Sequence, residues 1–258
     1  MKLVKLGGSV ITDKSRLRTF RRGVCDRLAK EMLAADDSLG IVHGAGSFGH
    51  IEAKKHSLHE GFKEDAQLKY VARVQRDVRE LNLMVLERLI DRGIRAVSVP
   101  PAAAGVFWDG TLHSFDREPF ESLLKLGLTP VSFGDVVPDE SMGFSICSGD
   151  LMMEALAKEF KPSTVVFCAD VDGVFESDPK RNRKAKLIGR LDPGTLSSLR
   201  RTQPRNADVT GSIYAKLERM LAISRHCEKC MIVNGNVQGR LEKALRGEEV
   251  VSTIVVPG

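Results

Sequence analysis

The sequence is poor in aromatic residues and has no long apolar run. It contains one tryptophan and two tyrosines, and aromatic residues make up 5% of its 258 residues. A helix needs about 20 consecutive apolar residues to span a bilayer, and no stretch of the chain approaches that length. Gly7 and Gly8 also interrupt the first apolar run before it could act as a secretion signal. We therefore expect no membrane partner and a cytoplasmic location.

Cysteine is also scarce, and its spacing is irregular. The five cysteines are Cys25, Cys147, Cys168, Cys227 and Cys230. An odd, scattered set does not make a disulfide framework. Cys227 and Cys230 have the spacing of half a zinc site, but such a site needs four ligands and no second pair is present. The sequence therefore predicts ordinary free thiols in a reducing compartment.

The excess of positive charge is small. The chain has 39 basic and 34 acidic residues, which leaves a net charge of +5. Surfaces that bind nucleic acid carry clustered basic residues, and single-stranded sites add aromatic residues. Here the basic residues are spread along the chain and aromatic residues are few. We therefore expect no nucleic-acid partner, whereas a mildly basic surface suits a protein with small anionic ligands.

Short apolar runs alternate with amphipathic stretches. Apolar runs that predict strands lie at residues 3–6, 39–43, 95–99, 130–133, 164–168, 231–233 and 253–256. Helical periodicity lies between most of them, with the clearest helices at 66–91, 148–160 and 213–225. Strands that alternate with helices predict an α/β fold with an open, mainly parallel sheet covered on both faces.

Four further stretches have a predicted structure. Residues 108–111 contain Asp-Gly and predict a β-hairpin, and residues 136–147 are expected to form a second one. Residues 52–65 are charged and rich in histidine, which predicts a solvated loop. A helix is expected near residues 24–33, with Leu33 on its buried face.

Glycine-rich turns follow several of the predicted strands. The first is Gly7-Gly8-Ser9, which comes directly after a strand that contains Lys5. Glycine lets backbone N–H groups approach a ligand closely, and a lysine adds positive charge, so the pair suits a phosphate. Ligands of open α/β sheets bind beyond the carboxyl ends of the strands. These turns are therefore expected to meet at one site.

Two common nucleotide motifs do not fit. Residues 44–49 match Gly-x-Gly-x-x-Gly, but no acidic residue ends the next strand as dinucleotide binding requires. Residues 105–110 have the glycine spacing of a Walker loop, but Thr111 stands where that loop needs lysine. The sequence therefore predicts neither a nicotinamide-dependent dehydrogenase nor a Walker-type nucleotide site.

Three segments, in the same order, resemble the amino-acid kinase superfamily. Residues 5–14 begin Lys-Leu-Gly-Gly-Ser, residues 169–179 run Ala-Asp-Val-Asp-Gly-Val-Phe to Asp-Pro, and residues 208–216 run Asp-Val-Thr-Gly to a lysine. Together they extend over nearly the whole chain. Two positions depart from the superfamily pattern: Ser212 stands where a second glycine is usual, and Phe175 where tyrosine is common.

Within the superfamily, residues 43–50 resemble the isopentenyl phosphate kinase family. Their sequence is His-Gly-Ala-Gly-Ser-Phe-Gly-His, and the Gly-Asp at 134–135 and the Ser-Gly-Asp at 148–150 fit the same family. The resemblance implies a three-layer αβα sandwich around an open, mainly parallel sheet. It also implies an N-terminal lobe, residues 1–160, for the acceptor and phosphate transfer. A C-terminal lobe, residues 161–258, would bind the nucleotide, with one sheet shared by both.

The resemblance implies a kinase that uses ATP to phosphorylate isopentenyl phosphate, giving isopentenyl diphosphate and ADP by direct in-line transfer. It also implies Mg²⁺, isoprene biosynthesis by the mevalonate pathway and a homodimer, and it assigns no residue as a metal ligand. Such a reaction brings two strongly negative groups together, so catalysis depends on positioning and charge stabilisation. The candidate catalytic residues are Lys14, Lys5 and His50.

Binding roles follow from the same resemblance. Acceptor binding is assigned to Ala45, His50 and Gly149. Nucleotide binding is assigned to Lys5, Leu6, Gly7, Gly8, Ser9, Gly46, Asp170, Phe175, Asp178, Pro179, Lys180, Gly211 and Lys216. An acceptor that is already a phosphate needs hydrogen-bond donors rather than a base, which suits an imidazole.

Some roles stay open at this point. Asp135 and Asp150 are each candidates to orient Lys14 or to help hold Mg²⁺. An isoprenoid tail needs an apolar slot, for which the long helix offers Val71, Val74, Leu81, Met84 and Val85. The alternatives to this function are a related kinase for a phosphonate, a carbamate or an amino-acid carboxylate, and a nucleotide sensor without catalysis. The presence of both Lys5 and Lys14 argues against the sensor.

Overall fold

The computed structural model describes residues 1–35, 38–179, 182–202 and 210–258. Eight strands form one sheet in the order β12-β14-β13-β9-β1-β2-β6-β3. They are β1 (Lys2–Leu6), β2 (Leu39–His43), β3 (Ala96–Ser98), β6 (Thr129–Phe133), β9 (Thr164–Ala169), β12 (Arg190–Leu191), β13 (Lys229–Asn234) and β14 (Ser252–Val255). The run from β13 to β3 is parallel, and β14 is antiparallel to β13. The predicted mainly parallel sheet is confirmed.

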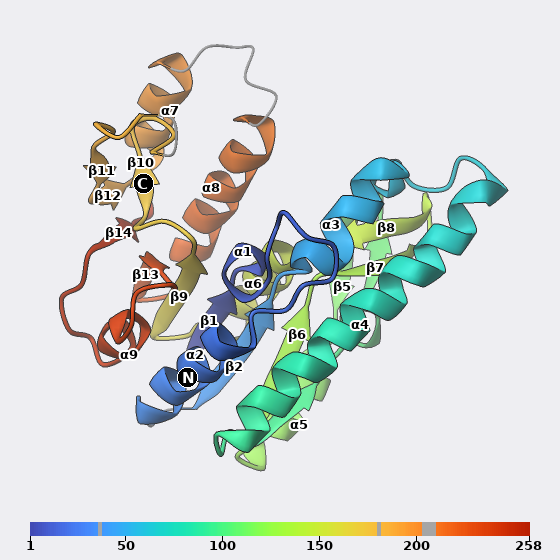
Figure 1. Cartoon of the computed structure of the whole chain (residues 1–258), viewed down its shortest axis with the longest axis horizontal. Coiled ribbons are helices and arrows are strands. Elements are labelled where there is room, and N and C mark those ends of the chain that lie inside the picture. The colour runs from blue at the N-terminus through green and yellow to red at the C-terminus, as the bar shows by residue number, and fades with distance from the viewer. Residues whose placement is uncertain (36–37, 180–181, 203–209) are drawn as a thin grey trace.

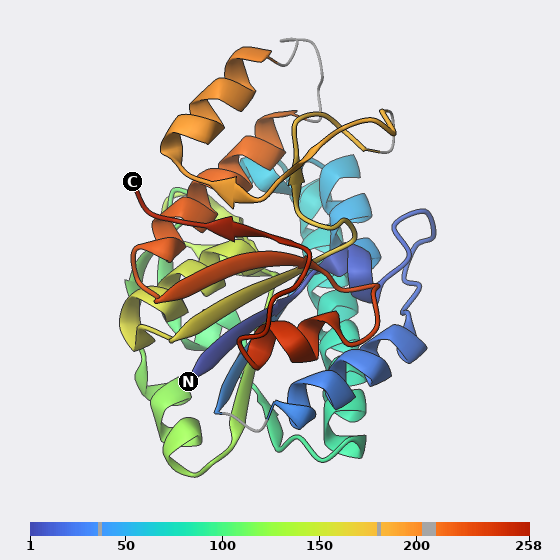
Figure 2. The ribbon, with the colours of Figure 1, turned by 90° about the vertical axis from the view of Figure 1, so that its left-hand side faces the viewer.

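Helices cover both faces of the sheet, so the predicted αβα sandwich is also confirmed (Figures 1 and 2). One face carries α2 (Arg22–Ala34), α4 (Leu68–Asp91) and α9 (Arg240–Leu245). The other carries α5 (Glu118–Lys125), α6 (Gly149–Phe160) and α8 (Thr210–Ser224), with α7 (Pro193–Thr202) against α8. In the described part of the chain, no helix is both long and apolar enough to cross a bilayer.

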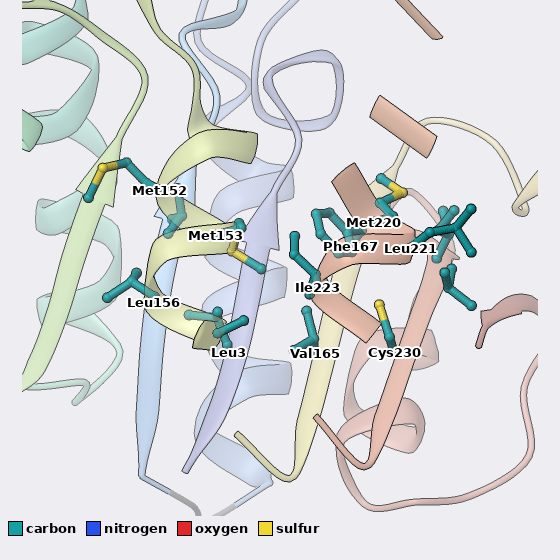
Figure 3. Packing of buried hydrophobic residues seen from close by; sticks show 14 of the residues in the cluster. Leu3, Met152, Met153, Leu156, Val165, Phe167, Met220, Leu221, Ile223 and Cys230 are labelled. Carbon is teal, nitrogen blue, oxygen red and sulfur yellow. The ribbon is translucent and has the colours of Figure 1, made fainter. Parts of the chain in front are cut away.

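The two layers of core follow from the alternation of side chains along each strand. Successive residues of a strand point to opposite faces. Leu3 therefore packs toward α6 and α8, with Val165 as its neighbour on β9, as Figure 3 shows. Val4 packs toward α2 and α9, with Val166 as its neighbour. Burial of each such side chain stabilises the fold by about 2 kcal/mol.

Both predicted hairpins are present, and they lie outside the main sheet. The first consists of β4 (Gly105–Trp108) and β5 (Thr111–Phe115), and the second of β7 (Asp135–Asp139) and β8 (Gly143–Cys147). Asp109 and Gly110 have φ angles of 50° and 68°, as a two-residue hairpin turn requires. The short pair β10 (Val174–Phe175) and β11 (Leu187–Ile188) was not predicted from the sequence.

Two expectations about helices are wrong, the first of them in part. Residues 52–65 are a solvated loop only in part: α3 (Gly46–Lys55) continues into them, η1 (Leu58–Glu60) and η2 (Asp65–Gln67) follow, and residues 61–64 between η1 and η2 form a loop. Leu58 is fully buried and the His56 ring stacks on Tyr70. Lys54 and Lys55 end α3, where basic residues are favourable, so the charges there are typical of a helix end rather than of a loop. Leu33 is 47% exposed and not on the buried face of α2.

The division into two lobes stays a prediction. The first strand of the proposed C-terminal lobe, β9, pairs with β1 from Lys2↔Thr164 to Leu6↔Cys168. The two halves of the chain therefore share the centre of one sheet, and the ends of β1 and β9 lie side by side. This pairing places the Gly7-Gly8 turn next to Asp170, which follows β9.

The carboxylate of Asp139 joins the tips of the two hairpins. It accepts hydrogen bonds from the backbone N–H groups of Asp109, Gly110, Ser141 and Met142, with N···O distances of 2.9–3.1 Å. Burial opposes the ionisation of Asp139, but the hydrogen bonds from Gly110 and Met142 outweigh it, and the pKa falls to about 2. The charged form therefore belongs to the folded structure.

Replacement of Asp139 by alanine is expected to lower the free energy of unfolding at pH 7 by about 2 kcal/mol, because four partly buried N–H groups lose a charged acceptor. The measurement is urea unfolding, with Glu140→Ala, an exposed site in the turn of the second hairpin, as control. In the parent protein the Asp139 contribution is present above about pH 4 and is lost as the pH falls toward 2. Equal stability of the two variants would contradict this role.

Candidate functional site

A cavity of about 560 Å³ lies at the carboxyl ends of the parallel strands. The turns that follow β1, β2, β6 and β9 all line it. It brings together most of the residues that the sequence singled out, namely Lys5, Gly7, Gly8, Ser9, Lys14, Ala45, His50, Gly149, Asp170, Phe175, Asp178, Pro179 and Lys216. Segments from positions 5 to 216 of the chain therefore meet at one site.

Two of the proposed nucleotide residues, Leu6 and Gly46, are not among the described residues that line the cavity. Leu6 is fully buried, and its carbonyl accepts a hydrogen bond from Gly44 N–H at 3.0 Å. Gly46 lies against Thr12 behind the turn. Gly211 lies in the first turn of α8, and its surroundings fall outside the described part of the chain, as does Lys180 itself. Leu6 and Gly46 thus support the site from behind.

The turns after β1 and β2 touch each other through their backbones. A Cβ on Gly8 would lie 2.6 Å from the Cα and N of Gly46, and a Cβ on Gly44 would lie 2.8 Å from the N of Gly8. Gly46 also has a φ of 51°, in the left-handed region that favours glycine. Only glycine allows this approach, so the Gly-rich sequences of both turns are explained by their mutual contact.

Three of the described helices begin at the cavity, namely α1 (Gly8–Ile11), α3 and α6. Gly8 at the start of α1, the N-cap Ala45 of α3, and Gly149 at the start of α6 line it, as does His50 one turn into α3. Ser148 caps α6 by accepting a hydrogen bond from Leu151 N–H at 3.2 Å. Helix N-termini present N–H groups and partial positive charge, which suits phosphate. The Gly7 N–H, by contrast, donates to the Cys168 carbonyl at 3.0 Å and continues the sheet.

Lys5 and Asp150 form a buried ion pair. The alternation along β1 turns Lys5 toward α6, and its Nζ donates to the Asp150 carboxylate. Burial lowers the pKa of Lys5, and Asp150 opposes that effect. Burial raises the pKa of Asp150, but Lys5 outweighs it, so the pKa of Asp150 is lowered overall. The sequence offered Asp150 as a partner of Lys14 or of Mg²⁺, whereas the ion pair in the structure is with Lys5.

Asp135 has a different partner and a different pKa. It accepts a hydrogen bond from Val136 N–H at 2.8 Å and lies 3.5 Å from the guanidinium of Arg79 on α4. Burial raises the pKa of Asp135 to about 6, although Arg79 and the Val136 N–H lower it in part. The carboxylate is thus held at the cavity wall between β6 and α4.

His50 lies on α3 and is open to the cavity. The protein around its ring lowers its pKa, and the charges of Lys216, Lys5 and Lys14 lower it further, in that order. At neutral pH the imidazole is therefore uncharged, with one ring N–H as donor. The influence of three lysines on one ring shows that their positive charges surround the same part of the cavity.

The two ends of the cavity are apolar. At one end, α3, α4 and the β7–β8 hairpin contribute Ala53, Val74, Val78, Val136 and Ile146. At the other end, β10 and α8 contribute Val174, Phe175, Ile213, Tyr214, Leu217 and Met220. The cavity therefore has apolar walls at both ends, and its lining also contains three lysines and four aspartates.

The apolar wall expected from the long helix is only partly correct. Val74 lines the cavity, but Leu81, Met84 and Val85 pack with the core over the main sheet, and Val71 packs in a small cluster beside the hairpin. The helix α4 is longer than the face it covers: its N-terminal half lies over α3 and β7, and its C-terminal half over α2 and β3. The apolar residues along one side of α4 therefore pack in two different places, beside the hairpin at the N-terminal half and in the main core at the C-terminal half.

Several residues that line the cavity were missed by the sequence reasoning. Val136 and Ile146 belong to the short second hairpin, and Tyr214 and Met220 belong to a predicted helix whose apolar residues were given no role. The alternating pattern of the hairpin and the helical spacing of Tyr214, Leu217 and Met220 gave a signal for an apolar face. That signal does not distinguish a cavity wall from core.

The chain is similar in sequence to a known family of kinases over most of its length. The sequence profile of the amino acid kinase family matches residues 1–234. The chain belongs to this family. A relative in Thermoplasma acidophilum, an isopentenyl phosphate kinase, is 36% identical over 256 residues, which cover 99% of this chain and 100% of the relative. An isopentenyl phosphate kinase of Methanothermobacter thermautotrophicus is 38% identical over 264 residues, which cover 98% of each.

Solved structures agree with this placement. An X-ray structure of isopentenyl phosphate kinase matches with a TM-score of 0.86 at 32% identity and covers 99% of this chain and 100% of its own. Within the amino acid kinase family the chain therefore belongs to the isopentenyl phosphate kinases, and it is an enzyme. A kinase of this family uses ATP as its co-substrate.

Replacement of Gly8 by alanine is expected to push the two turns apart, because the new methyl group meets the backbone of Gly46. We expect a free energy of unfolding lower by about 2 kcal/mol and ATP binding about tenfold weaker. The measurements are urea unfolding and titration calorimetry. Gly23→Ala is the control, since nothing lies within 4 Å of the added Cβ. ATP binding that is equal in the two variants would contradict the close approach.

Proposed function

We propose that this enzyme transfers the γ-phosphoryl group of ATP to isopentenyl phosphate and releases isopentenyl diphosphate and ADP. An oxygen of the acceptor phosphate attacks the γ-phosphorus in line, a new P–O bond forms, and the bond to the β-phosphate oxygen breaks. The names of the full-length relatives support this acceptor. The arrangement of the cavity supports it independently.

The observation that carries the proposal is the order in which apolar and charged residues follow one another along the cavity. Its apolar end between α3, α4 and the β7–β8 hairpin suits a short hydrocarbon chain, and its other end beside α8 suits a base and ribose. The lysines and helix N-termini lie between them. An acceptor with an apolar tail and a phosphate head, facing a nucleotide, matches this order, whereas a compact polar acceptor would leave the apolar end unfilled.

The lysines offset the repulsion between donor and acceptor phosphates. We assign Lys5 to the transferring phosphoryl group, because Asp150 fixes its ammonium at the end of the central strand. We assign Lys216, on α8, to the nucleotide phosphates, and Lys14 to the charge that develops between the two substrates. Fixed positive charges in a site with little water stabilise such charge far better than they would in solution.

His50 acts on the acceptor as a hydrogen-bond donor. The acceptor phosphate supplies its own nucleophilic oxygen, so the reaction needs no strong base. Because three lysines and the surrounding protein lower its pKa, the imidazole stays neutral and does not compete with the ammonium groups for the phosphate. Ala45 and Gly149, which also line the cavity, are assigned to the same phosphate through their backbones.

We propose that ATP binds with Mg²⁺. This ion is usually held by one or two carboxylates together with substrate phosphates and water, rather than by a cage of protein ligands. Asp170, which accepts a hydrogen bond from Ser9 at 3.0 Å, lies at the nucleotide side of the cavity and offers such a carboxylate. The ion supplies charge neutralisation at the β- and γ-phosphates. A homodimer, a cytoplasmic location and a place in the mevalonate pathway stay predictions.

The decisive test is incubation of the protein with ATP, Mg²⁺ and isopentenyl phosphate, with the products read by phosphorus NMR. His50→Ala is expected to lower kcat/KM about 100-fold, since a positioned donor is lost. His50→Gln keeps an N–H donor and should lose less. No diphosphate product from the parent protein, or turnover on a phosphonate, carbamate or carboxylate acceptor instead, would refute the proposed acceptor. Equal kcat/KM for His50→Ala and the parent would refute the role of the histidine.

The apolar end is tested on α4. Val78→Phe places a larger side chain at the cavity wall and is expected to raise KM for isopentenyl phosphate about tenfold while KM for ATP stays the same. The matched control is Leu83→Phe, because Leu83 is on the same helix and 66% exposed. A rise in KM for ATP of the same size would mean that the acceptor tail lies elsewhere.

A further inference from the structure

Lys14 lies on a loop that leaves the cavity and returns to it. Thr12 and Phe20 pair at the base of this loop as an antiparallel bridge, and Asp13 N–H donates to the Thr19 carbonyl at 2.9 Å. Between them residues 14–18 are exposed. The position of Lys14 therefore depends in part on how this loop is held.

Arg18 ties this loop to the body of the protein. Its backbone N–H donates to the Ser47 carbonyl at 3.3 Å, next to the glycine turn of α3. Its guanidinium lies 3.5 Å from the Asp77 carboxylate on α4 and also pairs with Glu80. Arg18 has a φ of 52°, which non-glycine residues adopt rarely, so its contacts hold the backbone in a conformation that it does not favour alone.

The partner of the exposed Arg18 side chain, Asp77, is itself buried. Its side chain is 3% exposed, and it accepts hydrogen bonds from Arg76 at 2.6 and 2.9 Å while Arg18 approaches the same oxygen. Exposed ion pairs contribute little to stability, but a buried carboxylate loses more when a partner is removed. On the same helix, Val74 and Val78 line the apolar end of the cavity.

We propose that the contact of Arg18 with Asp77 and Glu80 is a positioning device that holds the loop of residues 12–20, and with it Lys14, across the acceptor side of the cavity. The role of Lys14 in transfer rests on the proposed function. The holding of the loop does not, since it follows from the contacts alone. Arg18 thus acts through Lys14 and does not itself touch the substrates.

The holding of the loop is tested without any assay of activity. Hydrogen exchange of the amides of residues 14–18, and tryptic cleavage after Lys14, are compared in the parent, Arg18→Ala and Arg76→Ala. The Arg76 variant removes a partner of the same carboxylate but no contact of the loop, so it is the matched control. We expect exchange and cleavage about tenfold faster in Arg18→Ala only. Equal rates in the two variants overturn the proposal.

The effect on Lys14 is tested by the split between kcat and KM. Arg18→Ala and Asp77→Asn are expected to lower kcat about 10- to 100-fold, because small misplacements of a catalytic group have effects of this size, while KM for ATP stays within about twofold. The double variant should lose no more than the worse single one, and Arg18→Lys should restore part of the rate. Arg16→Ala, on the same loop but 77% exposed, should behave like the parent.

The outcomes separate the two proposals. If the parent protein phosphorylates no isopentenyl phosphate, the proposed function fails, and the exchange measurement still decides whether Arg18 holds the loop. If Arg18→Ala loosens the loop and kcat is unchanged, positioning of Lys14 is overturned while the proposed function stands. A third outcome is that both variants, Arg18→Ala and Arg76→Ala, change kcat and KM for ATP to the same extent. That result would mean that the substitutions disturb α4 in general, and it would also overturn the proposal.

Discussion

The close approach of two backbone turns is the constraint on which the rest of the site depends. Gly8 and Gly46 lie so near to each other that no side chain fits between them. This contact joins the ends of β1 and β2 and sets where Ser9, Lys5 and the start of α3 face the cavity. Lys5 is then placed relative to a rigid pair of turns, whereas Lys14 lies on the loop of residues 12–20 and Lys216 lies on α8.

The electrostatics of the site follow from this placement. An array of ammonium groups would destabilise the empty protein by mutual repulsion, and burial makes this worse for Lys5. The fold offsets that cost with one buried carboxylate, Asp150, at the start of α6. The lining has four aspartates besides its three lysines, so the positive charge is local to the ammonium groups, and the His50 imidazole remains neutral among them.

The sequence was sufficient for the fold and for most of the site, for identifiable reasons. Parallel strands buried on both faces are continuous apolar runs, so the strand of residues 164–168 was found almost to the residue. Glycine and lysine at strand ends located the cavity because such ends meet at one edge. Residues 52–65 were misread in part, since charged residues at a helix end look the same as a loop.

The contacts of individual side chains could not be predicted from the sequence. Which lysine Asp150 pairs with depends on the direction in which Lys5 leaves β1 and on how α6 crosses the sheet. Only part of the apolar end of the cavity was predicted. The apolar residues of α4 form one continuous row, and the position of the β7–β8 hairpin decides which of them face the cavity and which pack in the core. Both are properties of packing between elements that are distant in sequence.

The position of β1 has a consequence for how the chain folds as it is made. β1 is synthesised first but lies in the middle of the sheet, where it pairs with β2 on one side and, across more than 150 residues, with β9 on the other. During translation one edge of β1 therefore has no native partner until well over half of the chain has emerged. Such long-range pairing slows folding, and an unpaired strand edge invites association with other chains. The centre of the sheet is thus completed only after β9 has left the ribosome.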